Sequence, residues 1–235
     1  IILLTYINTK GLKNGKILQD LFTTSKILAL LGIIIFGFIL VKNSQWSGNM
    51  SFNWNAFQDF GQEVGNDLVP TGWKSIGGMT LLGGIAAAMV GSVFSSVAWE
   101  NVTFVSGEIE NPKKNVVKSM VLGTIVVMVL YMLVNFVYLH ALDRNGIAFA
   151  DKNRPAVAAS EVIFGSIGTI IMAVLVMVST FGCINGLVLA GARVFQTMAK
   201  DGLFFKSAIE NNQNNVPGKS LWMQGIWASV LALSG

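Results

Sequence analysis

Four long apolar runs constrain the fold of this chain more than any other feature of its sequence. They cover Ile17–Val41, Ser75–Trp99, Ser119–Leu142 and Val162–Ala192. A helix needs about 20 predominantly apolar residues to cross the hydrocarbon core of a bilayer, and each run meets that length. If the four helices were buried in a soluble protein, they would need an implausibly large core. The runs therefore predict an all-α, polytopic membrane protein.

The content and placement of charge agree with this prediction. Only 12% of the residues are charged, whereas a soluble domain carries about 25%. The charges cluster between the apolar runs. We therefore expect one transmembrane domain whose spans are residues 1–7 (partial), 17–42, 75–107 (broken near 95–98), 119–142, 162–192 and 220–235 (partial).

The lysines and arginines between the runs indicate orientation. Three segments are basic and contain Lys10, Lys13 and Lys16, then Lys113, Lys114 and Lys118, then Arg193, Lys200, Lys206 and Lys219. The two intervening segments, 42–74 and 143–161, balance their cations with acidic residues. Since cytoplasmic loops carry an excess of Lys and Arg, we expect the three basic segments on the cytoplasmic side.

Several classes of function have no support in the sequence. The chain has one cysteine and one histidine, which excludes an internal disulfide framework and a multi-histidine metal site. Cys183, inside an apolar run, is expected to be a small buried filler. No catalytic set or phosphate-binding loop is present, so we predict no enzyme, no cofactor and no ATP-driven transport. The net charge of +4 lies in short loops and predicts no nucleic-acid partner.

The two ends of the sequence resemble interrupted helices. The chain begins Ile1-Ile2-Leu3-Leu4, without the charged start of a signal peptide. It ends in the apolar segment Leu221–Gly235. We expect the chain to be a piece of a longer protein.

Lys26 is a charged residue within the first complete run. It lies about nine residues from the start of that run, which is roughly 13 Å along a helix. The lysine either extends to the cytoplasmic headgroups or holds its ammonium group inside the bundle. The sequence favours neither alternative.

A second polar stretch, Gly91–Asn101, lies midway along a segment that is too long for one straight span. Transporters place broken helices at such positions, where the half-helix ends face the substrate. The alternative is a long tilted helix whose serines bond back to their own turn. Asn135, Ser179, Thr180 and Asn185 are further polar residues at membrane depth, and are expected either to link helices or to contact a ligand.

Phe94–Val105, followed by Glu108-Ile109-Glu110-Asn111-Pro112-Lys113-Lys114-Asn115, resembles the sixth transmembrane helix and next loop of the amino acid permeases. These belong to the amino acid–polyamine–organocation superfamily, and the L-type amino acid transporter branch is the most similar. Asp20–Leu30 resembles the fifth helix, while Phe181–Gly186 and Ala192–Gly202 resemble the eighth helix and the loop after it. The resemblance implies a five-plus-five inverted repeat, of which this chain covers the end of helix 4 to the start of helix 9.

The resemblance also implies residue roles. Phe94 matches an aromatic residue that gates the substrate, and Trp99 matches the start of the inner half-helix. The stretch whose backbone carbonyls take the substrate ammonium group corresponds to Ser95, Ser96, Val97 and Ala98. Lys26 matches a lysine whose charge replaces the sodium ion of sodium-coupled relatives. Val97-Ala98 and Glu100 depart from the usual glycine and asparagine.

These features together predict a secondary active transporter of neutral amino acids in the plasma or inner membrane, working by sodium-independent exchange or with protons. The bilayer and an amino acid are its expected partners, while a homo-oligomer and an accessory subunit both stay open. One alternative is a polyamine or cationic amino acid carrier. Glu100 either favours such a cationic substrate or pairs with a helix that this chain does not contain. Another is a non-transporting receptor or partner subunit of the same fold.

Overall fold

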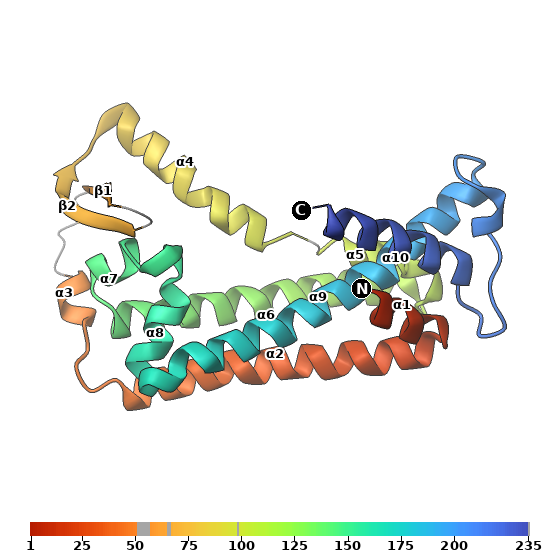
Figure 1. Ribbon diagram of the computed structural model, residues 1–235, viewed down its shortest axis with the longest axis horizontal. Coiled ribbons are helices and arrows are strands. Elements are labelled where there is room, and N and C mark those ends of the chain that lie inside the picture. Colours follow the sequence, from red (N-terminus) through yellow and green to blue (C-terminus); the bar gives the residue numbers. More distant parts are fainter. Residues whose placement is uncertain (51–56, 65–66, 98, 235) are drawn as a thin grey trace. The chain divides into compact units, whose positions relative to one another are not determined.

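The computed structural model describes residues 1–50, 57–64, 67–97 and 99–234, and helices dominate it (Figure 1). Four helical segments in the described part are long and apolar enough to cross a membrane: Lys13–Leu40, Gly78–Ser95, Pro112–Ala141 and Pro155–Lys200. The α-helices are α1 (Ile2–Thr9), α2 (Leu12–Leu40), α3 (Trp46–Met50), α4 (Gly78–Ser95), α5 (Asn101–Phe104), α6 (Pro112–Ala141), α7 (Arg144–Ala148), α8 (Pro155–Phe164), α9 (Gly168–Lys200) and α10 (Gly218–Leu233).

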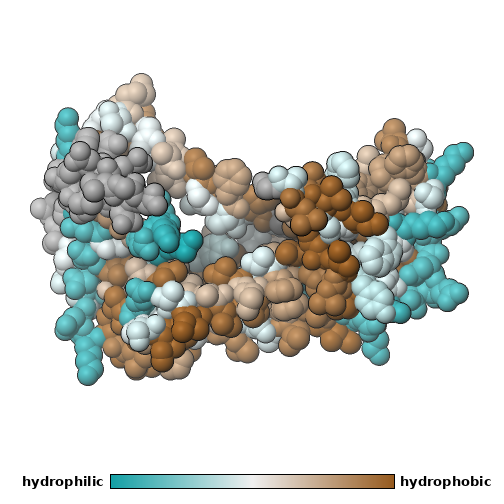
Figure 2. All heavy atoms as spheres, viewed as in Figure 1, coloured by the Kyte–Doolittle hydropathy of each residue, from teal (hydrophilic) through white to brown (hydrophobic). Residues whose placement is uncertain are grey.

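Most apolar side chains of these helices face outward. In the most apolar stretch of each spanning helix, at most 17% of the residues are buried. Helix α4 has no buried residue among those described. Figure 2 shows hydrophobic side chains along the helical segments and hydrophilic ones gathered at their ends and in the loop that follows α9. A water-soluble protein does not expose apolar surface on this scale. The chain is therefore a multi-pass membrane protein.

The chain forms two compact units, which are described separately. The first comprises Ile1–Ile27, Ala98–Thr124 and Val176–Gly235, and the second comprises Leu28–Val97 and Ile125–Leu175. Helices α2, α6 and α9 each contribute one part to each unit.

The core of the second unit is built where α2, α6, α8 and α9 contribute apolar side chains. It contains Ile33, Ile34, Val41, Leu130, Val134, Val137, Ala141, Leu142, Ala159, Ile163 and Met172. Val137 packs directly against Gly37, where an added Cβ would collide with its side chain. Close approach of α2 and α6 therefore requires a residue without a side chain at position 37.

The core of the first unit is smaller and consists of Val188, Ala192, Val216 and Leu221. Helix α1 packs along α10, and the buried Thr5 lies against Gly225. Polar side chains complete this core, and they are described with the candidate site below.

Helix α9 starts later than the sequence indicates. The expected span 162–192 begins within α8, which ends at Phe164, and Gly165 then has a φ of 69°. A glycine adopts this left-handed conformation without steric cost, so the chain turns here before α9 begins. At the other end α9 continues to Lys200.

A β-hairpin follows α3 and is not predicted by the sequence. Its strands, β1 (Phe57–Val64) and β2 (Asp67–Ser75), are antiparallel, with an irregularity between Phe60 and Gly61. Before the hairpin, the backbone amide of Gln45 donates to the carbonyl oxygen of His140 at 2.9 Å. The start of segment 42–74 is thus attached to the end of α6.

Candidate functional site

The polar stretch midway along the chain is a helix break. Helix α4 ends at Ser95, turns occupy the described residues up to Glu100, and α5 begins at Asn101. The hydroxyl groups of Ser95 and Ser96 both donate to the carbonyl oxygen of Ser92, at 2.9 and 2.8 Å. Serines thus bond back to their own turn, as the alternative from the sequence expected, but they do so where the helix ends.

The carbonyl groups at this break differ in their partners. The amide of Ser96 donates to Val93, and the hydroxyl group of Tyr131 on α6 donates to the carbonyl oxygen of Ser95 at 3.4 Å. Among the described residues, no hydrogen bond reaches the carbonyl oxygens of Ser96 and Val97. A backbone carbonyl within a membrane protein needs a partner, and the described residues supply none for these two.

The side chains around the break are exposed. Phe94 is 75% exposed and Trp99 is 60% exposed. Trp99 lies in the turn two residues before α5 and so precedes the inner half-helix instead of opening it. Ala98 lies outside the described residues. In the described part of the chain, no cation forms an ion pair with Glu100.

Lys26 on α2 directs its ammonium group towards α9. Its Nζ donates to the Sγ of Cys183 at 3.3 Å. A thiol is a weak acceptor, so this contact orients the lysine without neutralising it. Cys183 is exposed rather than buried, which corrects the expectation of a buried filler. It lies on the side of α9 that faces α2, next to a glycine that lets the lysine approach.

Packing between α2 and α9 is close at this point. The rings of Phe22 and Phe181 are stacked, with centroids 6.2 Å apart. A Cβ added to Gly182 would lie 2.8 Å from Cβ of Phe22 and 3.0 Å from Nζ of Lys26. Gly182 therefore makes room for both side chains.

Asn185 is the centre of a buried polar network in the first unit. Its side chain is completely buried. Its carbonyl oxygen accepts from Nδ2 of Asn8 on α1 at 2.8 Å, and its own Nδ2 donates to Oε1 of Gln19 on α2 at 2.9 Å. Asn185 also donates to the carbonyl oxygen of Gly15, at 3.5 Å. Its observed role is to link three helices.

The other polar residues singled out from the sequence bond locally. Asn135 donates to the carbonyl oxygen of Tyr131, and Thr180 donates to that of Val176, each one turn earlier on its own helix and at 2.8 Å. Ser179 is partly exposed and makes no hydrogen bond with its side chain within the described residues.

The structure thus places the predicted site residues in two groups. Phe94, Ser95, Ser96, Val97 and Asn135 belong to the second unit, whereas Lys26, Trp99, Glu100, Ser179, Thr180 and Asn185 belong to the first. Sequence reasoning missed Tyr131, Asn8, Gln19 and the role of Cys183. Only the polarity of Asn8 and Gln19 within largely apolar segments could have indicated them.

Comparison with known families settles what kind of protein carries this broken helix. The family model described as "Amino acid permease" matches residues 1–234. The chain belongs to the amino acid permease family. This permease is similar to the serine/threonine exchanger SteT of Bacillus subtilis, with 31% identity over 85% of this chain and 39% of the exchanger.

Two mammalian proteins illustrate the range of relatives. The human large neutral amino acids transporter small subunit 2 is 28% identical over 86% of this permease and 34% of its own length. The rat b(0,+)-type amino acid transporter 1 is 24% identical over 99% of this permease and 43% of its own length. The chain spans about two fifths or less of the length of SteT and of the human protein. These matches confirm the resemblance to the L-type branch and the partial coverage of the fold.

Proposed function

We propose that the intact protein is a secondary active transporter of neutral amino acids, independent of sodium, that works by exchange or with protons in the plasma membrane. One observation carries the proposal: α4 breaks at Ser95, and the carbonyl oxygens of Ser96 and Val97 accept no hydrogen bond within the described residues. An amino acid ammonium group is a triple donor that would satisfy such acceptors.

Lys26 supports the sodium-independent part of the proposal. The ammonium group of Lys26 on α2, directed towards Cys183 on α9, would supply a positive charge within the helices without a bound ion. Transport would then require Lys26 to keep its charge, or to exchange a proton where coupling is to protons. Family membership supports a permease, not an enzyme.

The names of the relatives support neutral substrates. They refer to serine and threonine in one case and to large neutral amino acids in another. An alternative, a polyamine or cationic amino acid carrier, rests on the acidic side chain of Glu100 beside the break. The names of these two relatives do not support this cationic alternative.

The test is uptake by the intact protein in proteoliposomes, compared with protein-free liposomes. Radiolabelled serine, leucine, arginine and putrescine would be supplied with sodium or with choline outside, with or without internal amino acid, and with or without a pH gradient. We expect saturable uptake of neutral amino acids that persists in choline. Stimulation by internal amino acid indicates exchange, whereas stimulation by an acidic exterior indicates proton coupling.

Other outcomes would replace the proposal. Uptake of arginine or putrescine alone would identify a cationic carrier. A need for sodium would refute the role of Lys26. Binding of an amino acid without uptake, by protein that is folded, would identify a receptor of the same fold.

A further inference from the structure

A groove of about 640 Å³ opens at the lysine-rich end of the first unit. Three segments line it: the end of α1, the loop between α9 and α10, and the first turns of α10. The lining residues are Tyr6, Thr9, Lys10, Ser207, Asn212, Asn214, Gly218, Lys219, Trp222, Met223 and Ile226. None of them belongs to the break or to the Lys26 contact.

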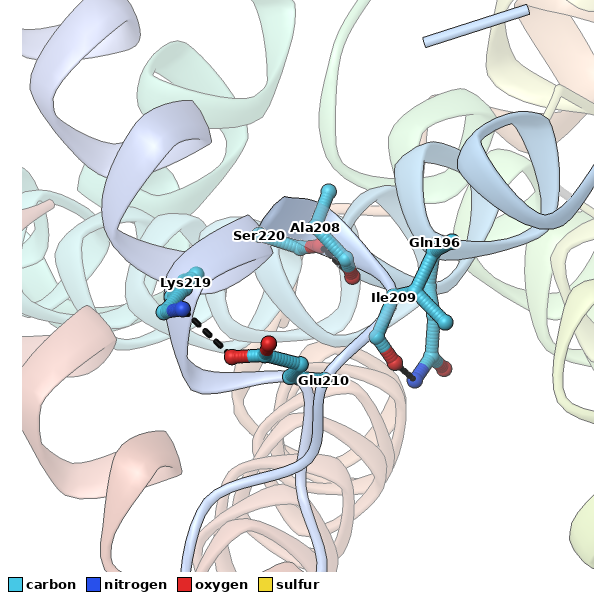
Figure 3. Close-up of polar contacts among 6 residues, drawn as sticks. All are labelled: Gln196, Ala208, Ile209, Glu210, Lys219 and Ser220. Carbon is cyan, nitrogen blue, oxygen red and sulfur yellow. Dashed lines mark hydrogen bonds and ion pairs between the residues drawn. The ribbon is translucent and has the colours of Figure 1, made fainter. Parts of the chain in front are cut away.

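The loop that forms one wall is fixed by hydrogen bonds. Asn212 and Asn214 donate through Nδ2 to the carbonyl oxygen of Thr9, at 2.8 and 3.1 Å. Figure 3 shows two further bonds of this loop, in which Gln196 donates to the carbonyl oxygen of Ile209 at 2.9 Å and Ser220 donates to that of Ala208 at 2.9 Å. The wall is therefore held in place without a ligand.

The floor of the groove changes from polar to apolar along α10. Gly218, Lys219, Trp222, Met223 and Ile226 have the spacing of one helix face. Lys219 stands at the start of the helix, and Ile226 follows about 10 Å further along the axis. Trp222 is 37% exposed and Ile226 is 58% exposed. A ligand that fits has a polar head and an apolar tail.

The charge at the polar end is positive. Nζ of Lys10 lies 4.9 Å from the ring centroid of Tyr6, and no carboxylate pairs with Lys10 in the described part of the chain. Lys219 is bound to Glu210, which does not line the groove (Figure 3). Lys10 thus supplies the available charge, while Glu210 competes with any anion for Lys219.

We propose that this groove binds an anionic phospholipid of the cytoplasmic leaflet. The phosphate would lie at Lys10 and the polar side chains of the loop, and an acyl chain would follow Trp222, Met223 and Ile226. Three observations favour a lipid over a soluble phosphate: the apolar half of the groove, the aromatic residues typical of headgroup depth, and the basic loops that predict this end to be cytoplasmic, where anionic lipids concentrate. The proposal requires an embedded protein, whether or not it transports amino acids.

Trp222 provides the test. The intact protein would be reconstituted in phosphatidylcholine vesicles that contain a small share of bromine-labelled phosphatidylglycerol or, for comparison, bromine-labelled phosphatidylcholine. Because the chain has six tryptophans, the fluorescence of Trp222 is obtained by subtracting the emission of Trp222→Phe from that of the wild type. We expect brominated phosphatidylglycerol to quench this signal severalfold more than brominated phosphatidylcholine at equal share. Equal quenching would overturn the proposal.

Charge variants identify the binding residues. Lys10→Gln should lower the apparent affinity for phosphatidylglycerol about fivefold, and Lys10→Arg should restore it. The matched control is Lys13→Gln, which removes the same charge from an exposed residue outside the groove. Equal losses in Lys10→Gln and Lys13→Gln would refute a specific site. Displacement of the lipid by excess glycerol phosphate would refute the lipid as occupant.

Discussion

Lys26 holds its charge against a thiol instead of a carboxylate, and this choice of partner leaves most of the charge available. Its Nζ donates to Cys183 at 3.3 Å, and a thiol compensates a cation poorly. In the proposed transporter, such a charge would attract any negative group that comes near this part of α2.

We predict that Lys26→Ala in the intact protein lowers amino acid uptake at least tenfold, because the cation that replaces a bound ion is lost. Uptake would be measured in proteoliposomes at several pH values and normalised to the amount of folded protein. Lys42→Ala, on an exposed residue beyond α2, is the control and should transport normally. Normal uptake by Lys26→Ala at every pH would show that the charge has no role.

Phe94 lies on the last turn of α4, one residue before the helix ends, and its side chain is 75% exposed. If it gates the substrate, Phe94→Ala should reduce the transport rate several times more than it reduces binding. The rate would come from uptake and the affinity from equilibrium binding of the same labelled amino acid. Equal losses in both measurements would argue against gating.

At the scale of elements, the close spacing between α2 and α9 depends on Gly182, which has no side chain. In Gly182→Ala, the new Cβ would lie 2.8 Å from Cβ of Phe22, which is fixed to the backbone and cannot rotate away. We expect destabilisation by about 1–3 kcal/mol, as is usual for overpacking. Thermal unfolding of the protein in detergent would measure it.

Gly123→Ala is the matched control, since nothing lies within 4 Å of a Cβ added to that residue of α6. Alanine favours a helix over glycine, so this variant should be neutral or slightly more stable. Equal behaviour of the two variants would mean that α2 and α9 are less closely packed than described.

The network around Asn185 should contribute more stability than a single hydrogen bond. Asn185→Leu would leave the half-buried oxygen of Gln19 without its donor and would leave Nδ2 of the buried Asn8 with only the carbonyl oxygen of Leu4. We expect a loss of about 2 kcal/mol, since unpaired buried polar groups are costly. Asn135→Leu, which removes a bond within one exposed helix turn, should cost less than about 0.5 kcal/mol. The same unfolding assay would compare them, and similar losses would remove the distinction.

At the scale of the whole molecule, the response to acid depends in part on the loop between α9 and α10. The hydrogen bond and the charge of Lys219 lower the pKa of the Glu210 carboxyl group. The folded state therefore binds this proton less readily than the unfolded state. The stabilisation is complete above the ordinary glutamate pKa of about 4.3 and is lost as the pH falls through the lower folded value.

We therefore expect backbone amides of residues 201–217 to exchange hydrogen faster below about pH 4 than their intrinsic pH dependence predicts. Glu210→Gln should show this faster exchange already at neutral pH, with no further acid effect. An unchanged exchange pattern in Glu210→Gln would mean that the ion pair does not order the loop.

The long helices could be predicted because apolar composition over about 20 residues is a strong and local signal. Their ends could not. The predicted span 119–142 omits the first turns of α6, which starts at Pro112 and carries Lys113, Lys114 and Lys118 beyond the apolar run. Pro70 and the glycines at 61 and 72 argue against strands in a sequence, and the hairpin forms regardless.

The candidate site was predictable only in part, for a different reason. The break follows from a polar stretch in one continuous segment, so the sequence displays it. The partners of Asn185 lie 166 and 177 residues away along the chain. No local pattern connects such residues, so the helix-linking role of Asn185 becomes evident only from the packing of α1 and α2 on α9.

The attachment of α3 to α6 has a consequence for modification of the chain. Nδ2 of Asn49 donates to the carbonyl oxygens of Leu139 and Leu142, both at 2.8 Å. Asn49-Met50-Ser51 is an acceptor sequence for N-linked sugar, and the sugar would be attached to this same nitrogen. Once α3 has packed against the end of α6, this nitrogen is engaged in both hydrogen bonds. A glycosylating host would have to modify Asn49 before this fold forms, or leave it bare.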